Sequence, residues 1–125
     1  MSFLVKFVEK LGTNSSSEQF TALWLDAEVY TKSDNQKTEQ RLRQLFNRFK
    51  TFDNKDQCEK YIRSSSKEQL LLIISGRFGR ELVPQIHDLP KVKAIYIFCK
   101  DTEGNKKWVG DFTKVNTYIF ILFFS

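Results

Sequence analysis

The chain has 125 residues, 41% of them hydrophobic, which is enough for one domain with a buried core and too little for two. Its net charge of +5 comes from 20 basic residues interspersed with 15 acidic ones, a mixture typical of a solvated surface rather than of a nucleic-acid-binding protein. The two cysteines provide neither a disulfide framework nor a zinc spacing. This composition argues against a disulfide-rich secreted domain and against a disordered chain.

The first part of the chain is the least regular. Lys6 and Glu9 interrupt the apolar stretch that a signal peptide would need, so we expect a cytoplasmic location. A polar, serine-rich stretch follows at Gly12–Ser17. We therefore expect residues 1–19 to form an N-terminal arm and linker, and residues 20–125 to form a single domain.

The domain begins with a short apolar strand, Ala22–Leu25, which ends at Asp26. A polar turn is predicted at Thr31–Asn35. A helix is predicted next, because apolar residues recur at the spacing i, i+3, i+4 and i+7; these are Leu42, Leu45, Phe46 and Phe49. Lys50–Phe52 is predicted to be a second short strand.

The next helix is predicted to begin at Asp53 as its N-cap, with Asp56 in the first turn, where the helix dipole favours an anion. Its buried stripe is predicted to be Cys58, Tyr61 and Ile62, and Ser64–Ser66 ends it. The uninterrupted apolar run Leu70–Ile74 then predicts a strand buried on both faces.

The helix after this strand carries Leu82, Val83 and Ile86 on one face, and we expect it to start within a turn of Pro84 or to bend there. Ala94–Cys99 is predicted to be the fourth strand, and a short helix with Trp108 and Phe112 follows the break at Gly104-Asn105. Tyr118–Phe124 is predicted to be the fifth strand and is too short to span a membrane.

The predicted strands start near residues 21, 49, 70, 94 and 117, which is the spacing of βαβ units. We therefore predict an α/β fold, a three-layer sandwich around a mostly parallel five-stranded sheet. The expected strand order is the flavodoxin-like or receiver-like order 2-1-3-4-5.

In such a sheet, ligands bind at the carboxyl ends of the strands. A tentative interaction surface at that edge comprises Asp26, Glu28, Arg77, Phe78 and Arg80. A weaker alternative is an anion site at Ser75, Gly76 and Gly79, because two glycines and two arginines lie where a helix begins. The competing interpretation is that Gly76 and Gly79 only shape a tight strand-to-helix turn.

No catalytic residue, metal site or cofactor is predicted. A phospho-receiver needs an acceptor aspartate where this chain has Ser75-Gly76. His87, the only histidine, and Cys99 are predicted at opposite edges of the sheet, so they cannot form the close pair that nucleophilic catalysis needs.

Several segments stand out when the chain is taken as a whole, namely Leu23–Glu28, Phe49–Asn54, Gln57–Ile62, Leu72–Gly76, Leu82–Pro90 and Ile95–Cys99. Together they resemble a receiver-like or TIR-like α/β module of bdelloid rotifer proteins. The likeness covers about residues 20–115. In those proteins the module precedes tetratricopeptide repeats or an arginine mono-ADP-ribosyltransferase domain. The resemblance implies a regulatory or protein-interaction part of a larger chain and carries over no catalytic residue.

The chain departs from that pattern at residues 116–125, which are aromatic where the module has a polar, acidic segment. Either these residues are a genuine fifth strand with an extension, or they are a non-native terminus of a truncated fragment. We thus expect a non-enzymatic module that binds a protein or a neighbouring domain. The alternatives are the N-terminal fragment of an NAD-dependent protein-arginine ADP-ribosyltransferase without its catalytic domain, and a nucleotide or small-anion sensor at residues 75–79.

Overall fold

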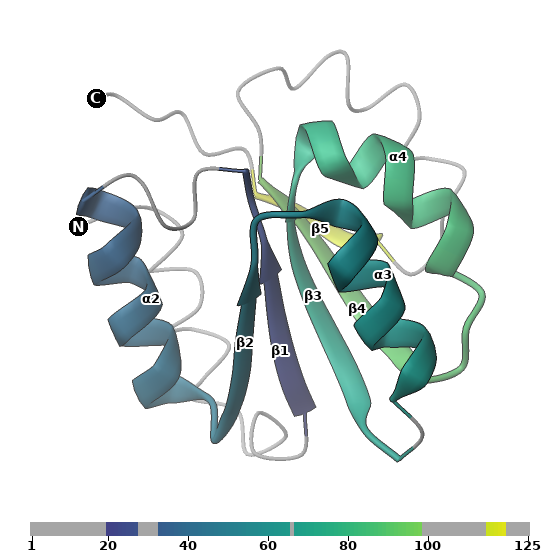
Figure 1. Cartoon of the computed structure of the whole chain (residues 1–125), viewed down its shortest axis with the longest axis horizontal. Coiled ribbons are helices and arrows are strands. Elements are labelled where there is room, and N and C mark those ends of the chain that lie inside the picture. The colour runs from purple at the N-terminus through teal and green to yellow at the C-terminus, as the bar shows by residue number, and fades with distance from the viewer. Residues whose placement is uncertain (1–19, 28–32, 66, 99–114, 120–125) are drawn as a thin grey trace.

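The computed structural model describes four stretches of the chain: residues 20–27, 33–65, 67–98 and 115–119. They form an α/β fold with a parallel sheet in which β2, β1, β3 and β4 lie side by side in that order (Figure 1). The α/β class and the parallel pairing predicted from the strand spacing are therefore confirmed.

Strands and helices alternate along the chain, which is what parallel neighbours require. The elements are β1 (Phe20–Leu25), α2 (Ser33–Leu45), β2 (Arg48–Phe52), α3 (Lys55–Ser64), β3 (Gln69–Ser75), α4 (Gly76–Ile86), β4 (Val92–Phe98) and β5 (Val115–Ile119). The short β5 pairs in parallel with β4 and begins three residues before the predicted Tyr118.

Several predictions fall outside the described residues and stay predictions. They are the N-terminal arm at residues 1–19, the side chains of Glu28 and Cys99, the short helix with Trp108 and Phe112, and residues 120–125.

Both faces of the sheet are covered, α2 lying on one side and α3 with α4 on the other (Figure 1). The α2 face holds the buried cluster Ala22, Trp24, Leu42, Phe46, Phe49, Leu71, Ile73, Ala94 and Tyr96. On the opposite face, the strand residues that alternate with those of the first cluster pack against α3 and α4. The helix residues in this second cluster are Cys58 and Ile62 of α3 and Leu82, Val83 and Ile86 of α4. Strand β3 supplies neighbouring residues to the two clusters in turn, so the prediction that it is buried on both faces is confirmed.

The first helix differs from the prediction at both ends. It begins at Ser33, inside the predicted turn Thr31–Asn35, and it ends at Leu45. Phe49 therefore does not extend the helical stripe but lies in β2. It still packs in the same cluster as Leu42, because the chain reverses direction between α2 and β2.

The starts of the other two helices also differ. The N-cap of α3 is Asn54 and not Asp53, since the Asn54 side chain accepts a hydrogen bond from the backbone N–H of Gln57. Helix α4 begins at Gly76, well before Pro84, which lies inside it. Pro84 is exposed, and it has no N–H to donate to the carbonyl four residues earlier in the helix.

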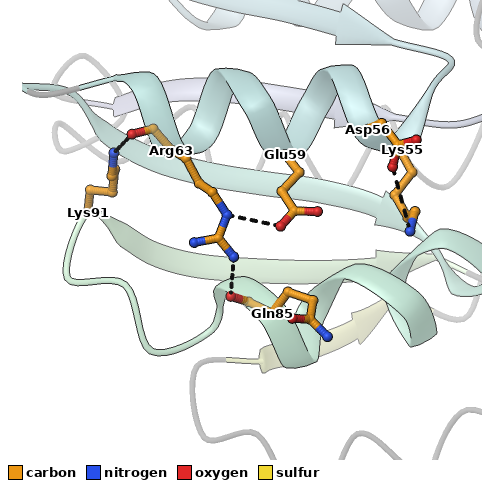
Figure 2. Close-up of polar contacts among 6 residues, drawn as sticks. All are labelled: Lys55, Asp56, Glu59, Arg63, Gln85 and Lys91. Atoms are coloured by element: carbon orange, nitrogen blue, oxygen red, sulfur yellow. Dashed lines mark hydrogen bonds and ion pairs between the residues drawn. The ribbon is translucent and has the colours of Figure 1, made fainter.

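Polar contacts tie α3 to α4 and to the start of β4 (Figure 2). Arg63 pairs with Glu59 one turn earlier and donates to the backbone oxygen of Gln85 at 3.1 Å. Lys91 donates to the backbone oxygens of Arg63 and Ser65 at the end of α3. These contacts satisfy carbonyls that a helix end leaves without partners.

Candidate functional site

The carboxyl edge of the sheet brings together the ends of β1, β2 and β3, as the parallel topology requires. Asp26 follows β1, and its backbone N–H donates to the carbonyl of Phe52 at 3.0 Å, which extends the pairing of β1 with β2 by one residue. Ser75 ends β3 and is the N-cap of α4. This edge is where the sequence predicted the interaction surface.

The predicted interaction residues of α4 lie in its first two turns. Arg77 and Arg80 are exposed, whereas Phe78 is half-buried and packs against the α3–α4 core cluster. The guanidinium carbon of Arg77 lies 6.0 Å from the centre of the Phe78 ring. An arginine with an aromatic ring beside it is a combination that protein interfaces favour.

The strand-to-helix transition predicted at residues 75–79 is tight, because β3 ends at Ser75 and α4 begins at Gly76. Gly76 and Gly79 belong to the first turn of α4, both are buried, and no glycine in the described part of the chain has a positive φ. Their missing side chains let the start of the helix approach the sheet closely. The Ser75 hydroxyl already accepts from the N–H of Phe78.

A second polar site, which the sequence did not predict, lies at the opposite edge of the sheet. It is a pocket of about 390 Å³ lined by Thr21, Asn47, Arg48, Phe49, Lys50, Tyr61 and Glu68. Thr21 and Arg48 are direct neighbours in the pairing of β1 with β2. Glu68 precedes β3, and Tyr61 reaches the pocket from α3.

Tyr61 and Glu68 form the central contact of this pocket. The Tyr61 hydroxyl donates to the carboxylate, 2.8 Å from Oε1 and 3.0 Å from Oε2. Burial, together with this hydrogen bond to a carboxylate, raises the pKa of Tyr61 to about 12. The pKa of Glu68 is lowered, chiefly by the Thr21 hydroxyl beside it, and against the opposing effect of burial.

Two further hydroxyls face the carboxylate without forming a hydrogen bond of good geometry. Thr21 is 2% exposed and Ser65 is 8% exposed. Their oxygens have no hydrogen-bond partner among the described residues, although both lie near enough to Glu68 to lower its pKa. Buried hydroxyls are usually paired, so this pocket is polar and incompletely satisfied.

Two cationic side chains, Arg48 and Lys50, line the same pocket. The ammonium nitrogen of Lys50 lies 5.1 Å from the centre of the Tyr61 ring. The charge of Arg48 lowers the pKa of both Tyr61 and Glu68, yet within the described residues no ion pair forms between Arg48 and Glu68. The pocket thus presents both signs of charge without a direct pairing between them.

No sequence motif indicates this pocket. Thr21 is an ordinary second residue of the apolar strand β1, and Glu68 lies in a polar connection 47 residues later. Tyr61 was predicted only as a member of a buried stripe, and it is half-buried. The one usable signal is the alternation along β2, which puts Arg48 and Lys50 on the face opposite Phe49.

Within the described stretches, no cluster of histidine, cysteine, aspartate and glutamate side chains is arranged to hold a metal ion. The described helices include none that is both long and apolar enough to cross a bilayer. Comparisons of the chain with protein-family models, with curated proteins and with solved structures found no match.

Proposed function

We propose that this chain is a regulatory module without enzymatic activity that binds another protein or a neighbouring domain of a longer protein. The observation that supports the proposal is the surface formed by Arg77, Phe78 and Arg80 at the start of α4. Two exposed guanidinium groups flank a ring that is anchored in the core, so the ring can be covered by a partner with little loss of side-chain entropy.

The finer fold and context form part of the same proposal. A five-stranded flavodoxin-like sheet of order 2-1-3-4-5 is supported by the parallel pairing of β5 with β4. Membership of the receiver-like or TIR-like module is supported by the sequence segments described above. A location in the cytoplasm is part of the same proposal.

The test is a pull-down from cell extract with three forms of the chain. The first is the wild type, and the second carries Arg77→Glu with Arg80→Glu. The third, a matched control, carries Lys37→Glu with Lys60→Glu, which reverses two exposed charges on α2 and α3. Melting temperatures of the three forms establish that all of them fold.

We expect the arginine variant to recover less than a tenth of the specific partner that the wild type and the control recover. The reason is that two carboxylates in place of two guanidinium groups reverse the charge that a partner of the wild-type surface would have to complement. If the arginine variant retains every partner at the wild-type level, the proposed surface is wrong.

A further inference from the structure

The pocket at the amino edge of the sheet contains a buried hydroxyl that lies beside the Glu68 carboxylate but forms no hydrogen bond of good geometry with any described residue. Thr21 lines the pocket, is 2% exposed, and has no hydrogen-bond partner for Oγ1 among the described residues. A hydroxyl is both a donor and an acceptor, and groups buried to this degree are nearly always paired. A bound molecule in the pocket would supply the missing partner.

The same pocket is lined by charged groups of both signs that form no ion pair with one another among the described residues. Glu68 accepts a hydrogen bond from Tyr61 and lies beside the Thr21 and Ser65 hydroxyls, and a carboxylate has about four acceptor positions, so at least one is open to a ligand. Arg48 and Lys50 line the pocket as well, and no ion pair involving either is found in the described part of the chain. Each charge is therefore available to a ligand.

We propose that this pocket binds a small molecule carrying both a carboxylate and an ammonium group, such as an α-amino acid or a dipeptide. The carboxylate is held by Arg48, whose guanidinium matches a carboxylate with two parallel hydrogen bonds. The ammonium group donates to Glu68, and the Thr21 hydroxyl pairs with the ligand between the two charges.

Ligands with only one kind of charge fit less well. An inorganic anion would meet the Glu68 carboxylate, and a simple amine would meet Arg48 and Lys50, so each would be opposed by part of the lining. The volume of about 390 Å³ lies at the small end of ligand pockets, which suits an amino acid or a dipeptide.

The first experiment compares ligand chemistries on the whole wild-type chain. Amide chemical shifts are followed by NMR during titration with the standard amino acids and glycylglycine. Acetate, methylammonium and inorganic phosphate serve as probes with one kind of charge. We expect at least one zwitterion to shift Thr21 and Glu68 with a Kd at least tenfold below those of all three probes.

Two results of this titration would overturn the proposal. If phosphate or acetate binds as tightly as every zwitterion, the pocket is an anion site. If no compound shifts these residues at millimolar concentration, the pocket is not a site for small zwitterions. Neither result bears on the surface around Phe78, which lies at the other edge of the sheet.

A second experiment asks which side chains hold the ligand identified in the titration. Glu68→Gln and Arg48→Gln should each raise its Kd at least tenfold, while Lys37→Gln, which removes an exposed charge on α2, should leave it unchanged. Glu68→Gln keeps an acceptor for the Tyr61 hydroxyl, which helps to preserve the fold. Equal affinities in all three variants would contradict the assigned contacts.

Discussion

At the scale of single residues, Tyr61 is a titratable group whose shifted pKa can be measured directly. Its folded-state pKa is raised from 10.0 to about 12, so the folded chain prefers the neutral phenol. The stability that this preference contributes is present below pH 10 and is lost as the pH rises towards 12. Above that range the phenolate would lie against the Glu68 carboxylate.

We expect the difference in ultraviolet absorbance between the wild type and Tyr61→Phe to titrate with a midpoint near pH 12. The substitution keeps the ring, whose centre lies 5.8 Å from that of Phe52, and removes only the hydroxyl. Tyr96→Phe, which removes one phenol from β4, serves as the control. A Tyr61 midpoint near 10 would show that neither the burial of the phenol nor its hydrogen bond to Glu68 persists in solution.

Cys58 is a buried thiol that we expect to be chemically inert. It is fully buried on α3, and this burial, with a smaller effect of the Glu59 charge, raises its pKa to about 12. Since the thiolate is the reactive form, only about one thiol in ten thousand is ionised at pH 8.

In a Cys99→Ser background, Cys58 should react with Ellman's reagent in guanidinium chloride and remain unmodified in the native chain over the same time. Free glutathione gives the reference rate at each condition. Modification of the native chain at a rate close to that of glutathione would mean that α3 detaches from the sheet readily.

At the scale of elements, the sequence located the helices better than it located their first residues. Asp53 and Asn54 are neighbouring residues with equally suitable side chains for capping, and composition alone does not separate them. The backbone geometry decides, because Asn54 has the extended conformation of an N-cap and reaches the N–H of Gln57 at 3.0 Å.

Replacing Asn54 with alanine should therefore lower the free energy of unfolding by about 1 kcal/mol, and the matched change Asp53→Ala should leave it nearly unchanged. Urea unfolding of both variants and the wild type measures the difference. If Asp53→Ala costs as much as Asn54→Ala, the helix begins one residue earlier than the structure has it.

The difference at Phe49 has a similar origin. Leu42, Phe46 and Phe49 satisfy the helical spacing, and all three are buried in one cluster. The chain reverses between Leu45 and Arg48, so the last aromatic residue enters that cluster from a strand. A periodic pattern indicates that residues share a core, but it does not indicate whether each residue belongs to a helix or to a strand.

At the scale of the whole molecule, the three layers make β3 the strand on which both cores depend. Ile73 faces the α2 cluster, Ile74 faces the α3–α4 cluster, and both are 0% exposed. Ile73→Ala and Ile74→Ala should each lower the free energy of unfolding by roughly 2–5 kcal/mol, because each leaves a cavity.

Chemical denaturation of the two variants tests the layered arrangement directly. Similar losses are expected, since each side chain lies under a helix-covered face. A loss below about 1 kcal/mol for one of them would indicate that its face is open to solvent, where truncation costs little. Gln69→Ala, an exposed position at the start of the same strand, is the control.

The sequence by itself determined the α/β class, the four confirmed strands and many of the apolar residues that the two cores contain. These features follow from the local alternation of apolar side chains, and the continuous run Leu70–Ile74 identifies the strand buried on both faces. Such information is carried by residues close together in the chain. It needs no knowledge of which strands become neighbours.

Only the tertiary structure decided the capping residues, the placement of Phe49 and the polar pocket. The pocket depends on the register that sets Thr21 beside Arg48 and on the packing of α3, which brings Tyr61 to Glu68. Its residues come from β1, β2, α3 and the connection before β3, and none of them is unusual in its own segment. Their chemistry arises from proximity, which parallel pairing and helix packing create and which a linear pattern does not contain.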